Sequence, residues 1–418
     1  MDEIFRDLML MSNKVKTTKM NQSKYKLVPR LRFPEFNDAG EWEVKPLNKA
    51  CQVNPSVQNL PNKFIYVDLE SVKDGTLLQK KNIQLDGAPS RAQRLLKKGD
   101  VLFQMVRPYQ QNNYFFNTEE SIPYVASTGY AQLRACESND YLFQYLHNDK
   151  FLERVLDKCT GSNYPAIKSS DLSKIEIAIP SPLEQQKIAD CLSSIDDLIT
   201  AESKKLESIK NHKKGLMQNL FPSDGKTTPN FRFPEFQNAG DWEETILGNH
   251  CKITTGKLDA NAMVENGQYR FYTCAKEYYL IDKYAFDTDA LLVSGNGANV
   301  GYIHYYKGKF NAYQRTYVLD QFSQDIFFIK YYLERNLHKR IATEKKEGNT
   351  PYIVISTLTD MIVALPKNKK EQQKIADCLS YADELITSQT QKIEVLKTHK
   401  KGLMQQLFPN IDQNHKSK

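Results

Sequence analysis

The chain has 418 residues, more than one ordinary domain of about 100 to 200 residues, so its length predicts two or more hydrophobic cores. Lysine and arginine (57) outnumber aspartate and glutamate (50), which gives a net charge of +7 and mildly favours a polyanionic partner. Seven cysteines with no C-x-x-C pair exclude a disulfide framework and a zinc knuckle, the absence of a long apolar run excludes a membrane span, and 23 Tyr with 20 Phe exclude a disordered chain.

The first 29 residues are expected to form a flexible extension ahead of the first domain. The opening MDEIFRDLML carries three acidic residues and makes a poor signal peptide, and Met11 offers an alternative start. Ser12 to Lys24 is polar and basic. Without a signal peptide or a membrane span, we expect a soluble cytoplasmic protein, a compartment that also suits unpaired cysteines.

The chain contains an internal repeat. LRFPEFNDAGEWE at position 31 returns as FRFPEFQNAGDWE at position 231, identical at nine of thirteen positions. EQQKIADCLS at Glu184 returns unchanged at Glu371, and HKKGLMQNLFP at His212 returns as HKKGLMQQLFP at His399, both with an offset of 187. The stretches between these segments are dissimilar except near their ends, where NYPAIKSSDLSKIEIAIP (163–180) matches NTPYIVISTLTDMIVALP (349–366). One repeated frame therefore holds two different inserts.

Each EQQ-led segment is expected to form one long helix, over 184–221 and 371–409. Apolar residues recur at alternating steps of four and three, which is the heptad seam of a coiled coil. The seam residues are Ile188, Leu192, Ile195, Ile199, Leu206, Ile209, Leu216 and Leu220, and then Ile375, Leu379, Ala382, Ile386, Ile393, Leu396, Leu403 and Leu407. Polar residues interrupt the seam at matching positions, Glu202 with Gln389 and Lys213 with Lys400, which predicts a fixed register at some cost in stability.

The inserts, over 30–183 and 231–370, carry mixed strand and helix patterns. Isoleucine alternates through Lys174 to Pro180, and Met361 to Leu365 is the matching buried strand. Tyr141 to Lys158 and Asp325 to Ala342 have helical spacing. SGNGANVG from Ser294 to Gly301 misplaces the third glycine of a dinucleotide fingerprint, so we expect a tight turn between strands. A linker at 222–230 and a tail at 410–418 complete the chain.

Two FPEF segments, two dissimilar inserts and two nearly identical helices together resemble the specificity subunit of type I restriction-modification enzymes, over roughly 30–409. The resemblance implies an α+β fold with two mixed α/β target recognition domains, separated by two long antiparallel coiled-coil helices in a pseudo-twofold repeat. It implies that each domain reads one half of a split DNA target and that the helices act as a spacer. Because the inserts differ, the target is expected to be asymmetric.

The resemblance also implies partners and cofactors. Double-stranded DNA, two methyltransferase subunits and two motor-nuclease restriction subunits are the implied partners, and no membrane is involved. The complex would methylate adenine at N6 and cleave DNA with ATP, whereas the specificity subunit itself is not an enzyme. S-adenosylmethionine, ATP and Mg²⁺ then belong to the partner subunits, and none is bound by this chain.

Polar loops of the inserts are the candidate DNA readers, because Arg pairs with guanine and Asn or Gln with adenine in the major groove. The candidates in the first insert are Arg91, Arg94, Gln104, Arg107, Tyr109, Gln110, Asn112, Ser127, Thr128 and Lys168. Those in the second are Lys257, Ser294, Asn296, Asn299, Tyr313, Gln314, Arg315 and Thr316. The two lysines are candidates for phosphate contacts, which position a protein without specifying sequence. A solvated loop without DNA contact is the alternative for each residue.

Polar positions shared by the two long helices are candidates for docking two identical partner subunits. They are Glu184, Gln185, Lys187, His212, Lys213, Glu371, Gln372, Lys374, His399 and Lys400. Trp42 and Trp242 are expected to be packing anchors, and Cys191 and Cys378 small packing residues. No catalytic residue and no metal site is predicted.

Two other functions stay open at this stage. A coiled-coil scaffold that binds only proteins would show no salt-dependent DNA binding. A self-contained methyltransferase or nuclease with fused recognition domains would need a cofactor loop. The stretch Asn54-Pro55-Ser56-Val57 lacks the second proline and the aromatic residue of the adenine methyltransferase signature, and no phosphate-binding G-x-x-x-x-G-K-S/T is present.

Overall fold

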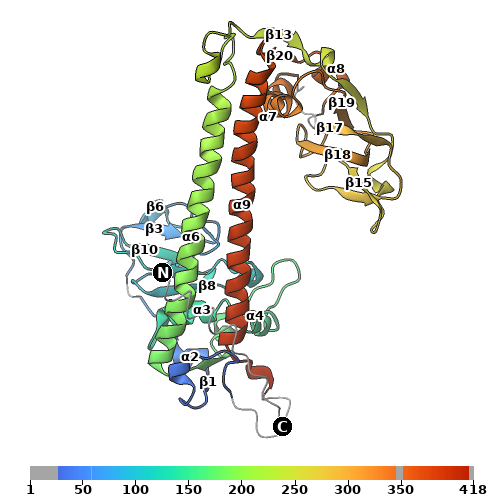
Figure 1. Cartoon of the computed structure of the whole chain (residues 1–418). Helices are drawn as coiled ribbons and strands as arrows, with labels where there is room; N and C mark the ends of the chain where they lie inside the picture. Colours follow the sequence, from blue (N-terminus) through green and yellow to red (C-terminus); the bar gives the residue numbers. More distant parts are fainter. Residues whose placement is uncertain (1–26, 58, 345–351, 414–418) are drawn as a thin grey trace. The chain divides into compact units, whose positions relative to one another are not determined.

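The computed structural model describes residues 27–57, 59–344 and 352–413, so the extension predicted over 1–29 lies almost wholly outside the described residues. The chain forms two compact units, one from residues 1–202 with 393–418 and the other from 203–392. Two long helices, α6 (Pro182–Asn219) and α9 (Lys369–Leu407), each contribute one end to each unit (Figure 1). In the described ranges no helix is long and apolar enough to cross a membrane.

The described residues 42–180 of the first unit, here called the first domain, form two four-stranded sheets, with orders β6-β3-β10-β7 and β2-β11-β8-β9. The strands are β2 (Cys51–Val53), β3 (Lys63–Val67), β6 (Lys81–Gln84), β7 (Ala92–Leu95), β8 (Asp100–Gln104), β9 (Tyr114–Phe116), β10 (Tyr124–Ser127) and β11 (Tyr130–Ala135). β10 pairs with β3 in parallel, and the other pairs in these sheets are antiparallel. β8 is buried along its length, as its apolar run Val101-Leu102-Phe103 requires.

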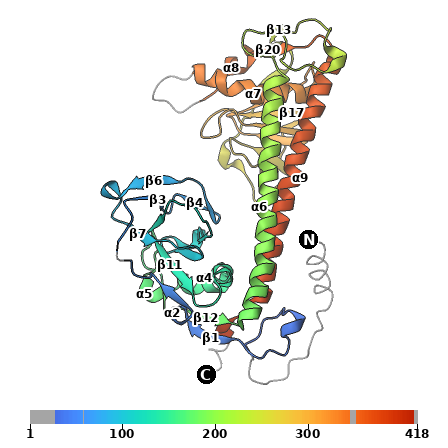
Figure 2. The same ribbon diagram turned by 90° about the vertical axis from the view of Figure 1, so that its left-hand side faces the viewer.

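Two smaller ladders belong to the same domain. β4 (Val72–Lys73) pairs with β5 (Thr76–Leu77), and β1 (Glu43–Pro46) pairs antiparallel with β12 (Glu176–Ile179). The β1–β12 ladder joins the two ends of the domain beside the start of α6 (Figure 2). The first and last strands of the domain are therefore paired with each other where the domain meets the long helix.

Four short helices are described in the first domain: α2 (Leu47–Ala50), α3 (Asn139–Tyr145), α4 (Asp149–Leu156) and α5 (Ser169–Leu172). The helical spacing over 141–158 corresponds to two helices, because the helix is interrupted between α3 and α4. Asn148 begins α4 as its N-cap, with its side chain accepting from the Lys150 N–H at 2.8 Å. Asparagine is among the best N-cap residues, so it starts a new helix here instead of continuing the old one.

The described residues 242–366 of the second unit, here called the second domain, form one six-stranded sheet with the order β14-β19-β17-β18-β15-β16. The strands are β14 (Lys252–Thr255), β15 (Tyr269–Tyr272), β16 (Tyr279–Ile281), β17 (Phe286–Ser294), β18 (Ile303–Ala312) and β19 (Thr316–Asp320). β17 and β18 are antiparallel neighbours, which confirms the turn predicted at SGNGANVG. A ladder of β13 (Glu243–Ile246) with β20 (Ile362–Leu365) closes the base of this domain as β1–β12 closes the first.

The second domain also contains α7 (Ile326–Glu344) and α8 (Ile355–Thr359). α7 covers all but the first residue of the stretch 325–342 that the spacing indicated. Its apolar residues Phe328, Leu333, Leu337 and Ile341 are buried, as helical periodicity requires. The described 3₁₀ turns are Pro34–Phe36, Leu85–Gly87, Pro108–Gln110, Pro234–Phe236, Leu247–Asn249, Ala260–Ala262 and Ile411–Gln413.

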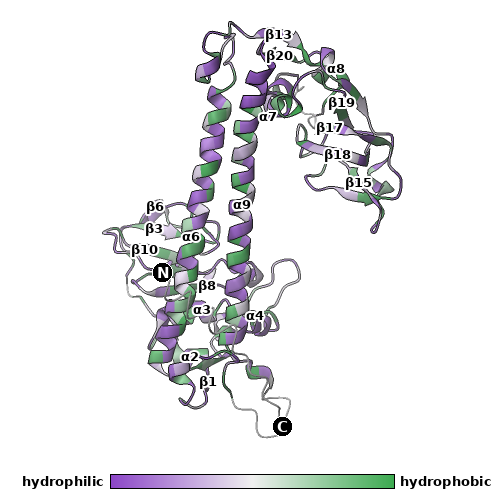
Figure 3. Cartoon of the chain, viewed as in Figure 1, coloured by the Kyte–Doolittle hydropathy of each residue, from purple (hydrophilic) through white to green (hydrophobic). Residues whose placement is uncertain are grey.

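Within each unit, the start of one long helix packs against the end of the other. In the first unit the shared core contains Ile188, Leu192 and Ile195 with Leu403 and Leu407. In the second it contains Leu220, with Leu216 packed against it, and Ile375 and Leu379. The two helical segments therefore run antiparallel within each unit, and apolar residues recur among hydrophilic ones along both (Figure 3).

A buried ion pair ties the FPEF segment of each unit to its long helix. Arg32 donates through Nε and Nη2 to the two carboxylate oxygens of Glu184, both at 2.8 Å, and Trp42 Nε1 donates to Oε1 at 3.2 Å. The second unit repeats these contacts at 2.7, 2.8 and 3.3 Å with Arg232, Trp242 and Glu371. Both tryptophans are buried, which confirms them as packing anchors.

Candidate DNA interface and partner surface

The loop that follows β8 in the first domain is organised around the buried amide of Gln104. Its Nε2 donates to the Val106 carbonyl and to Gln110 Oε1, both at 2.8 Å, and its Oε1 accepts from the Asn112 N–H at 3.0 Å. Asn113 Oδ1 accepts from the Gln104 N–H at 2.9 Å. These bonds fix the loop from inside, so its backbone is shaped before any ligand binds.

Two residues of this loop have a left-handed backbone, Arg107 with φ of 53° and Gln111 with φ of 51°. Residues other than glycine adopt this conformation rarely, and such strain is concentrated at functional sites. Tyr109, between them, is exposed, and Arg107 is partly exposed. The loop therefore presents an arginine and an aromatic ring to solvent in a fixed geometry.

Arg91 and Thr128 lie together in the first domain, because the Thr128 N–H donates to the Arg91 carbonyl at 2.8 Å. Arg91 is exposed, and Arg94 is partly buried, with burial lowering the pKa of its guanidinium. Lys168 is exposed at the start of α5. These positions add basic side chains to the same domain.

The turn between β17 and β18 is the corresponding feature of the second domain. The Ser294 N–H donates to the Tyr302 carbonyl at 2.9 Å, and the Gly301 N–H returns a bond to the Ser294 carbonyl at 2.8 Å. Asn299 Nδ2 donates to the Cys274 carbonyl at 3.0 Å, which fixes the turn to the segment after β15. Gly301 has φ of 81°, a conformation that glycine adopts without strain.

Arg315 and Asn296 are brought beside this turn. The Gly295 N–H donates to the Arg315 carbonyl at 2.8 Å, and Asn296 pairs with Tyr352 in an isolated bridge. Arg315 is exposed, and Asn296 is partly exposed. The structure thus gathers residues from three separate segments where β17 ends and β19 begins.

The remaining candidates of the second domain lie just before β19 or next to a residue that pairs there. Gln314 is exposed, and its Nε2 donates to Asp259 Oδ1 at 2.7 Å. Tyr313 is half-buried and bridges to Leu258, next to the exposed Lys257. The second domain therefore carries a polar cluster that matches the predicted one, with one lysine at its border.

Four of the predicted DNA-reading residues are buried: Gln104, Ser127, Ser294 and Thr316. Ser294 and Thr316 are partners in the β17–β19 ladder, and Ser127 Oγ accepts from the Gly129 N–H at 3.1 Å. These four are therefore corrected from base-reading residues to residues that shape the loops. Each is the first or last residue of a strand. In the sequence its polar side chain suggested an exposed loop, whereas in the structure the side chain points inward.

Sequence reasoning missed two exposed tyrosines beside the candidate loops. Tyr164 is 64% exposed and Tyr352 is 56% exposed. Both belong to the stretches 163–180 and 349–366, whose likeness between the copies indicated framework. The sequence does contain one indication of both residues, an aromatic residue beside a proline shortly before a short helix.

Four residues of the predicted docking set are buried inside the frame. Glu184 and Glu371 accept the arginine and tryptophan bonds described above. Gln185 Nε2 donates to Glu137 at 2.6 Å, and Gln372 Nε2 donates to Gln324 at 2.9 Å. Because these four residues are buried, they are not part of the docking surface. Their identity between the copies preserves an internal contact of each unit.

Lys213 and Lys400 are largely occupied as well. Lys213 Nζ lies 2.6 Å from Asp383 Oδ1, and Lys400 Nζ lies 2.6 Å from Asp196 Oδ2. Both lysine side chains are less than one-fifth exposed. We therefore assign these lysines to the pairing of the helices and remove them from the docking surface.

The rest of the docking set faces solvent. Lys187 lies 3.3 Å from Glu35, and Lys374 lies 3.5 Å from Glu235, so the two copies present the same exposed ion pair. His212 and His399 are also exposed. Within the docking set, the exposed positions that match between the copies are thus Lys187 with Lys374, each paired with a glutamate, and His212 with His399.

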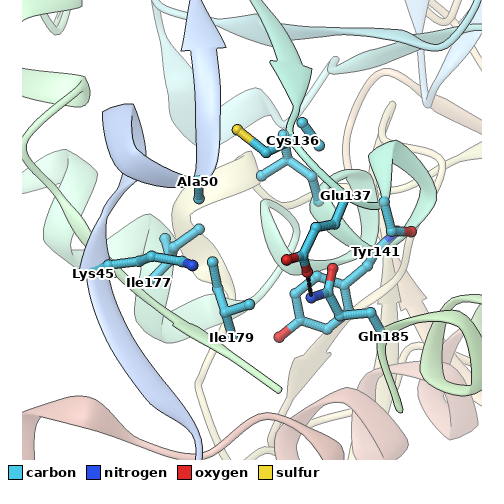
Figure 4. A pocket seen from close by; sticks show the side chains of 11 residues that line it. Lys45, Ala50, Cys136, Glu137, Tyr141, Ile177, Ile179 and Gln185 are labelled. Atoms are coloured by element: carbon cyan, nitrogen blue, oxygen red, sulfur yellow. Dashed lines mark hydrogen bonds between the residues drawn. The ribbon is translucent and has the colours of Figure 1, made fainter. Parts of the chain in front are cut away.

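A small cavity lies in the first unit where β1 and β12 meet the start of α6 (Figure 4). Its volume is about 30 Å³, and Lys45, Glu137, Tyr141 and Gln185 are among the residues that line it. Binding sites for small molecules usually occupy about 300–1,000 Å³. The cavity has room for water but not for a substrate, so it is not a catalytic pocket.

A wider depression of about 410 Å³ lies beside α5, lined by Asn, Gln, Ser, Cys and Val side chains without a carboxylate, imidazole or amine. One of its residues is Cys51, and burial raises the pKa of this thiol to about 12, so it is not a thiolate nucleophile at neutral pH. Among the described residues no group of three or more His, Cys, Asp or Glu is arranged to hold a metal.

Comparison with known families decides what kind of chain carries these two domains. Residues 40–211 and 239–398 match the family described as the type I restriction modification DNA specificity domain, once for each half of the repeat. The chain belongs to this family. The two matches together span most of both inserts and most of both long helices.

Individual relatives agree with this family. The chain is 46% identical over 140 residues to the type I restriction enzyme EcoDI specificity subunit of Escherichia coli, an alignment that covers 33% of this chain and 30% of that protein. It is 26% identical over 296 residues to the MjaIX specificity subunit of Methanocaldococcus jannaschii, covering 64% of this chain and 68% of that one. The crystal structure of the S subunit from M. genitalium shares the fold, with a TM-score of 0.62 at 16% identity over 92% of this chain and all of that one.

Proposed function

We propose that this chain is the DNA-reading subunit of a type I restriction-modification complex and recognises an asymmetric target in two separate parts. The observation that carries this proposal is one frame used twice with unlike domains. The ion pair of Arg32 with Glu184 recurs as Arg232 with Glu371, whereas the described strands form two four-stranded sheets in one domain and one six-stranded sheet in the other. Because the two domains occupy equivalent places in the frame but differ in fold, we expect the two halves of the target to differ as well.

Direct reading of bases is assigned to the candidate side chains that are at least partly exposed. In the first domain these are Arg91, Arg94, Arg107, Tyr109, Gln110, Asn112 and Thr128, and in the second Asn296, Asn299, Tyr313, Gln314 and Arg315. Arginine, asparagine and glutamine make the bidentate contacts that distinguish bases in the major groove. Lys168 and Lys257 are assigned to phosphates, where a point charge positions the domain.

The long helices are proposed to set the gap between the two half-sites. α6 has 38 residues and α9 has 39, so each is about 57 Å long at 1.5 Å per residue. Half-sites one helical turn apart on DNA are separated by about 34 Å. Four residues added to one helix lengthen it by about 6 Å, and we expect the gap to grow by one or two base pairs. An unchanged gap would count against a spacer role.

Two methyltransferase subunits are proposed to bind at equivalent places on the two helices. Lys187 with Lys374, and His212 with His399, are exposed and identical between the copies. Two identical partners need two identical surfaces, and these residues offer them. Restriction subunits would join this core, and S-adenosylmethionine, ATP and Mg²⁺ are assigned to the partner subunits, with no catalytic role for this chain.

Mapping methylated adenines in cells that express the chain with its methyltransferase tests the proposal. We expect a consensus of two unlike parts with a gap of unspecified bases between them, and DNA binding by the purified complex that weakens as salt rises. DNA binding that is absent or independent of salt would favour a protein-binding scaffold. Methylation of DNA by the chain alone would favour a self-contained enzyme.

A further inference from the structure

The guanidinium of Arg107 lies on the ring of Tyr164, with 4.2 Å between Cζ and the ring centroid. The two residues come from segments far apart in the sequence, the loop after β8 and the stretch before α5. The Arg107 N–H donates to the Pro165 carbonyl at 2.7 Å, and Val106 pairs with Ala166 in an isolated bridge. Backbone pairing therefore brings the arginine and the ring together and holds the stack at its base.

The stack faces solvent and is not part of a core. Tyr164 is 64% exposed, and among the described residues its ring stacks on no other aromatic ring. A tyrosine that served only to pack would bury most of its surface, since burial is what stabilises a core ring. The exposed ring instead supports a charged group at the surface.

The guanidinium donors of Arg107 are free within the described chain, which contains no carboxylate in ion-pair distance of them. Two arginines of the same unit differ in this respect: Arg134 bonds the buried Asp100 at 2.8 Å, and Arg32 bonds Glu184. A guanidinium over the face of a ring makes this contact without using its N–H donors, which form a planar fork that matches two acceptors side by side. Arg107 is therefore arranged to meet an acceptor pair outside the chain.

The backbone strain at Arg107 supports the same conclusion. Its φ of 53° lies in the left-handed region, and the Gln104 amide network holds the loop in this conformation. Such strain persists where the surroundings fix a side chain for a task. In the major groove, guanine presents O6 and N7 as adjacent acceptors, and arginine contacts both.

We propose that Arg107 and Tyr164 form one reading unit that recognises a guanine in the half-site bound by the first domain. Arg107 makes the base contact, and Tyr164 is a positioning residue that acts through Arg107. This inference rests on the proposed function and deepens it by naming a base. Arg315, beside the turn of the second domain, has no stacked ring among the described residues, so the other half-site serves as an internal control.

The test is a map of methylated sites in cells that express the methyltransferase with the wild-type chain, Arg107→Ala, Arg107→Lys, Tyr164→Ala or Tyr164→Phe. We expect both arginine variants to lose the preference for G·C at one position of one half-site by roughly 10-fold or more. Tyr164→Ala should weaken the same preference, whereas Tyr164→Phe should keep it, because the stack uses the ring and not the hydroxyl. The other half-site should stay unchanged in every variant.

Several results would overturn the reading unit. A uniform loss of methylation without a change of base preference indicates a phosphate contact. A full guanine preference in Arg107→Lys shows that charge alone suffices, because lysine lacks the planar fork. A normal preference in Tyr164→Ala removes the ring from the unit. Thermal unfolding of each purified complex checks that the variant is folded. If Arg107→Ala fails to assemble, the base preference of Arg107→Lys tests the reading unit. A wild-type complex without a two-part consensus would instead refute the proposed function.

Discussion

Lys213 of α6 and Asp383 of α9 form an ion pair in the second unit, with Nζ 2.6 Å from Oδ1. The same pair recurs in the first unit, but there the lysine is on α9 and the aspartate on α6. Lys400 Nζ donates to the two carboxylate oxygens of Asp196 at 2.6 and 2.7 Å. The lysines that interrupt the apolar seam in the sequence therefore meet an acid of the facing helix. A polar pair inside an apolar seam selects one register, because any shift would leave the charges unpaired.

The pair of Lys213 with Asp383 should be weakly but measurably coupled. Asp383 is about one-third exposed, so a double-mutant cycle with Lys213→Ala and Asp383→Ala should give roughly 0.5 to 1 kcal/mol. Because the chain has two units, one free energy of unfolding does not describe it, and each unit needs its own reporter. Trp242 fluorescence in a Trp42→Phe background reports the second unit during denaturant unfolding. A coupling of zero would show that the pair does not select the register.

Asp383 should also make the second unit sensitive to acid. Burial raises its pKa, but the hydrogen bonds from Lys213 and Tyr331 and the positive charges of Lys213 and Lys330 together lower it more, so the net pKa is below the ordinary value of 3.8. A carboxyl with a lowered pKa adds stability in full above its unfolded pKa and loses it as the pH falls through the folded value. The difference in stability between wild type and Asp383→Asn should therefore shrink below about pH 4. Unfolding monitored by Trp242 at several pH values measures it, and a constant difference would argue against the shift.

Removing Glu184 should damage the first unit far more than removing its exposed neighbour Lys187. Glu184→Ala leaves Arg32 buried without its acid, which costs about 3–5 kcal/mol. Lys187 belongs to an exposed pair with Glu35, so Lys187→Ala should cost less than about 1 kcal/mol. Trp42 fluorescence in a Trp242→Phe background reports this unit. Equal effects of the two substitutions would be inconsistent with a buried anchor at Glu184.

Gly215 and Gly402 occupy the same position of the two helices, inside the HKKG segment. A Cβ at either position would meet no atom within 4 Å. Glycine inside a helix costs about 0.5–1 kcal/mol relative to alanine, so Gly215→Ala and Gly402→Ala should stabilise the free chain by that amount. If a methyltransferase subunit docks on the HKKG surface, the added methyl groups should weaken assembly, measured by titration of the purified subunits. Stabilisation with unchanged assembly would place the docking surface elsewhere.

The repeat and its long helices are visible in the sequence because periodicity is local. α6 and α9 begin two residues before the predicted 184 and 371 and end two residues before 221 and 409. The acid that each seam lysine meets is not visible, since Lys213 and Asp383 are 170 positions apart and their meeting depends on how the helices pair. Periodicity identifies the seam but does not pair its residues.

The candidate site is only partly visible in the sequence. The clusters around Arg107 and Arg315 were found because arginine and amide residues gather there, but residue type does not reveal which polar side chains turn inward. Gln104 and Ser294, for example, are buried at strand ends. Glu184 was predicted to dock a partner because it is identical in the two copies, but the identity preserves a buried contact. Tyr164 was missed because its contact with Arg107 joins two loops, and such a contact follows from the tertiary fold alone.

Exchange of one domain tests most directly whether each domain reads its own half of the DNA target. The segment from Trp42 to Pro180 is replaced by that of another family member, while Arg32, Glu184 and the helix contacts stay in place. We expect the mapped methylation target to change in one half, with the other half and the gap preserved. A change in both halves, or in neither, would contradict two independent reading domains on one repeated frame.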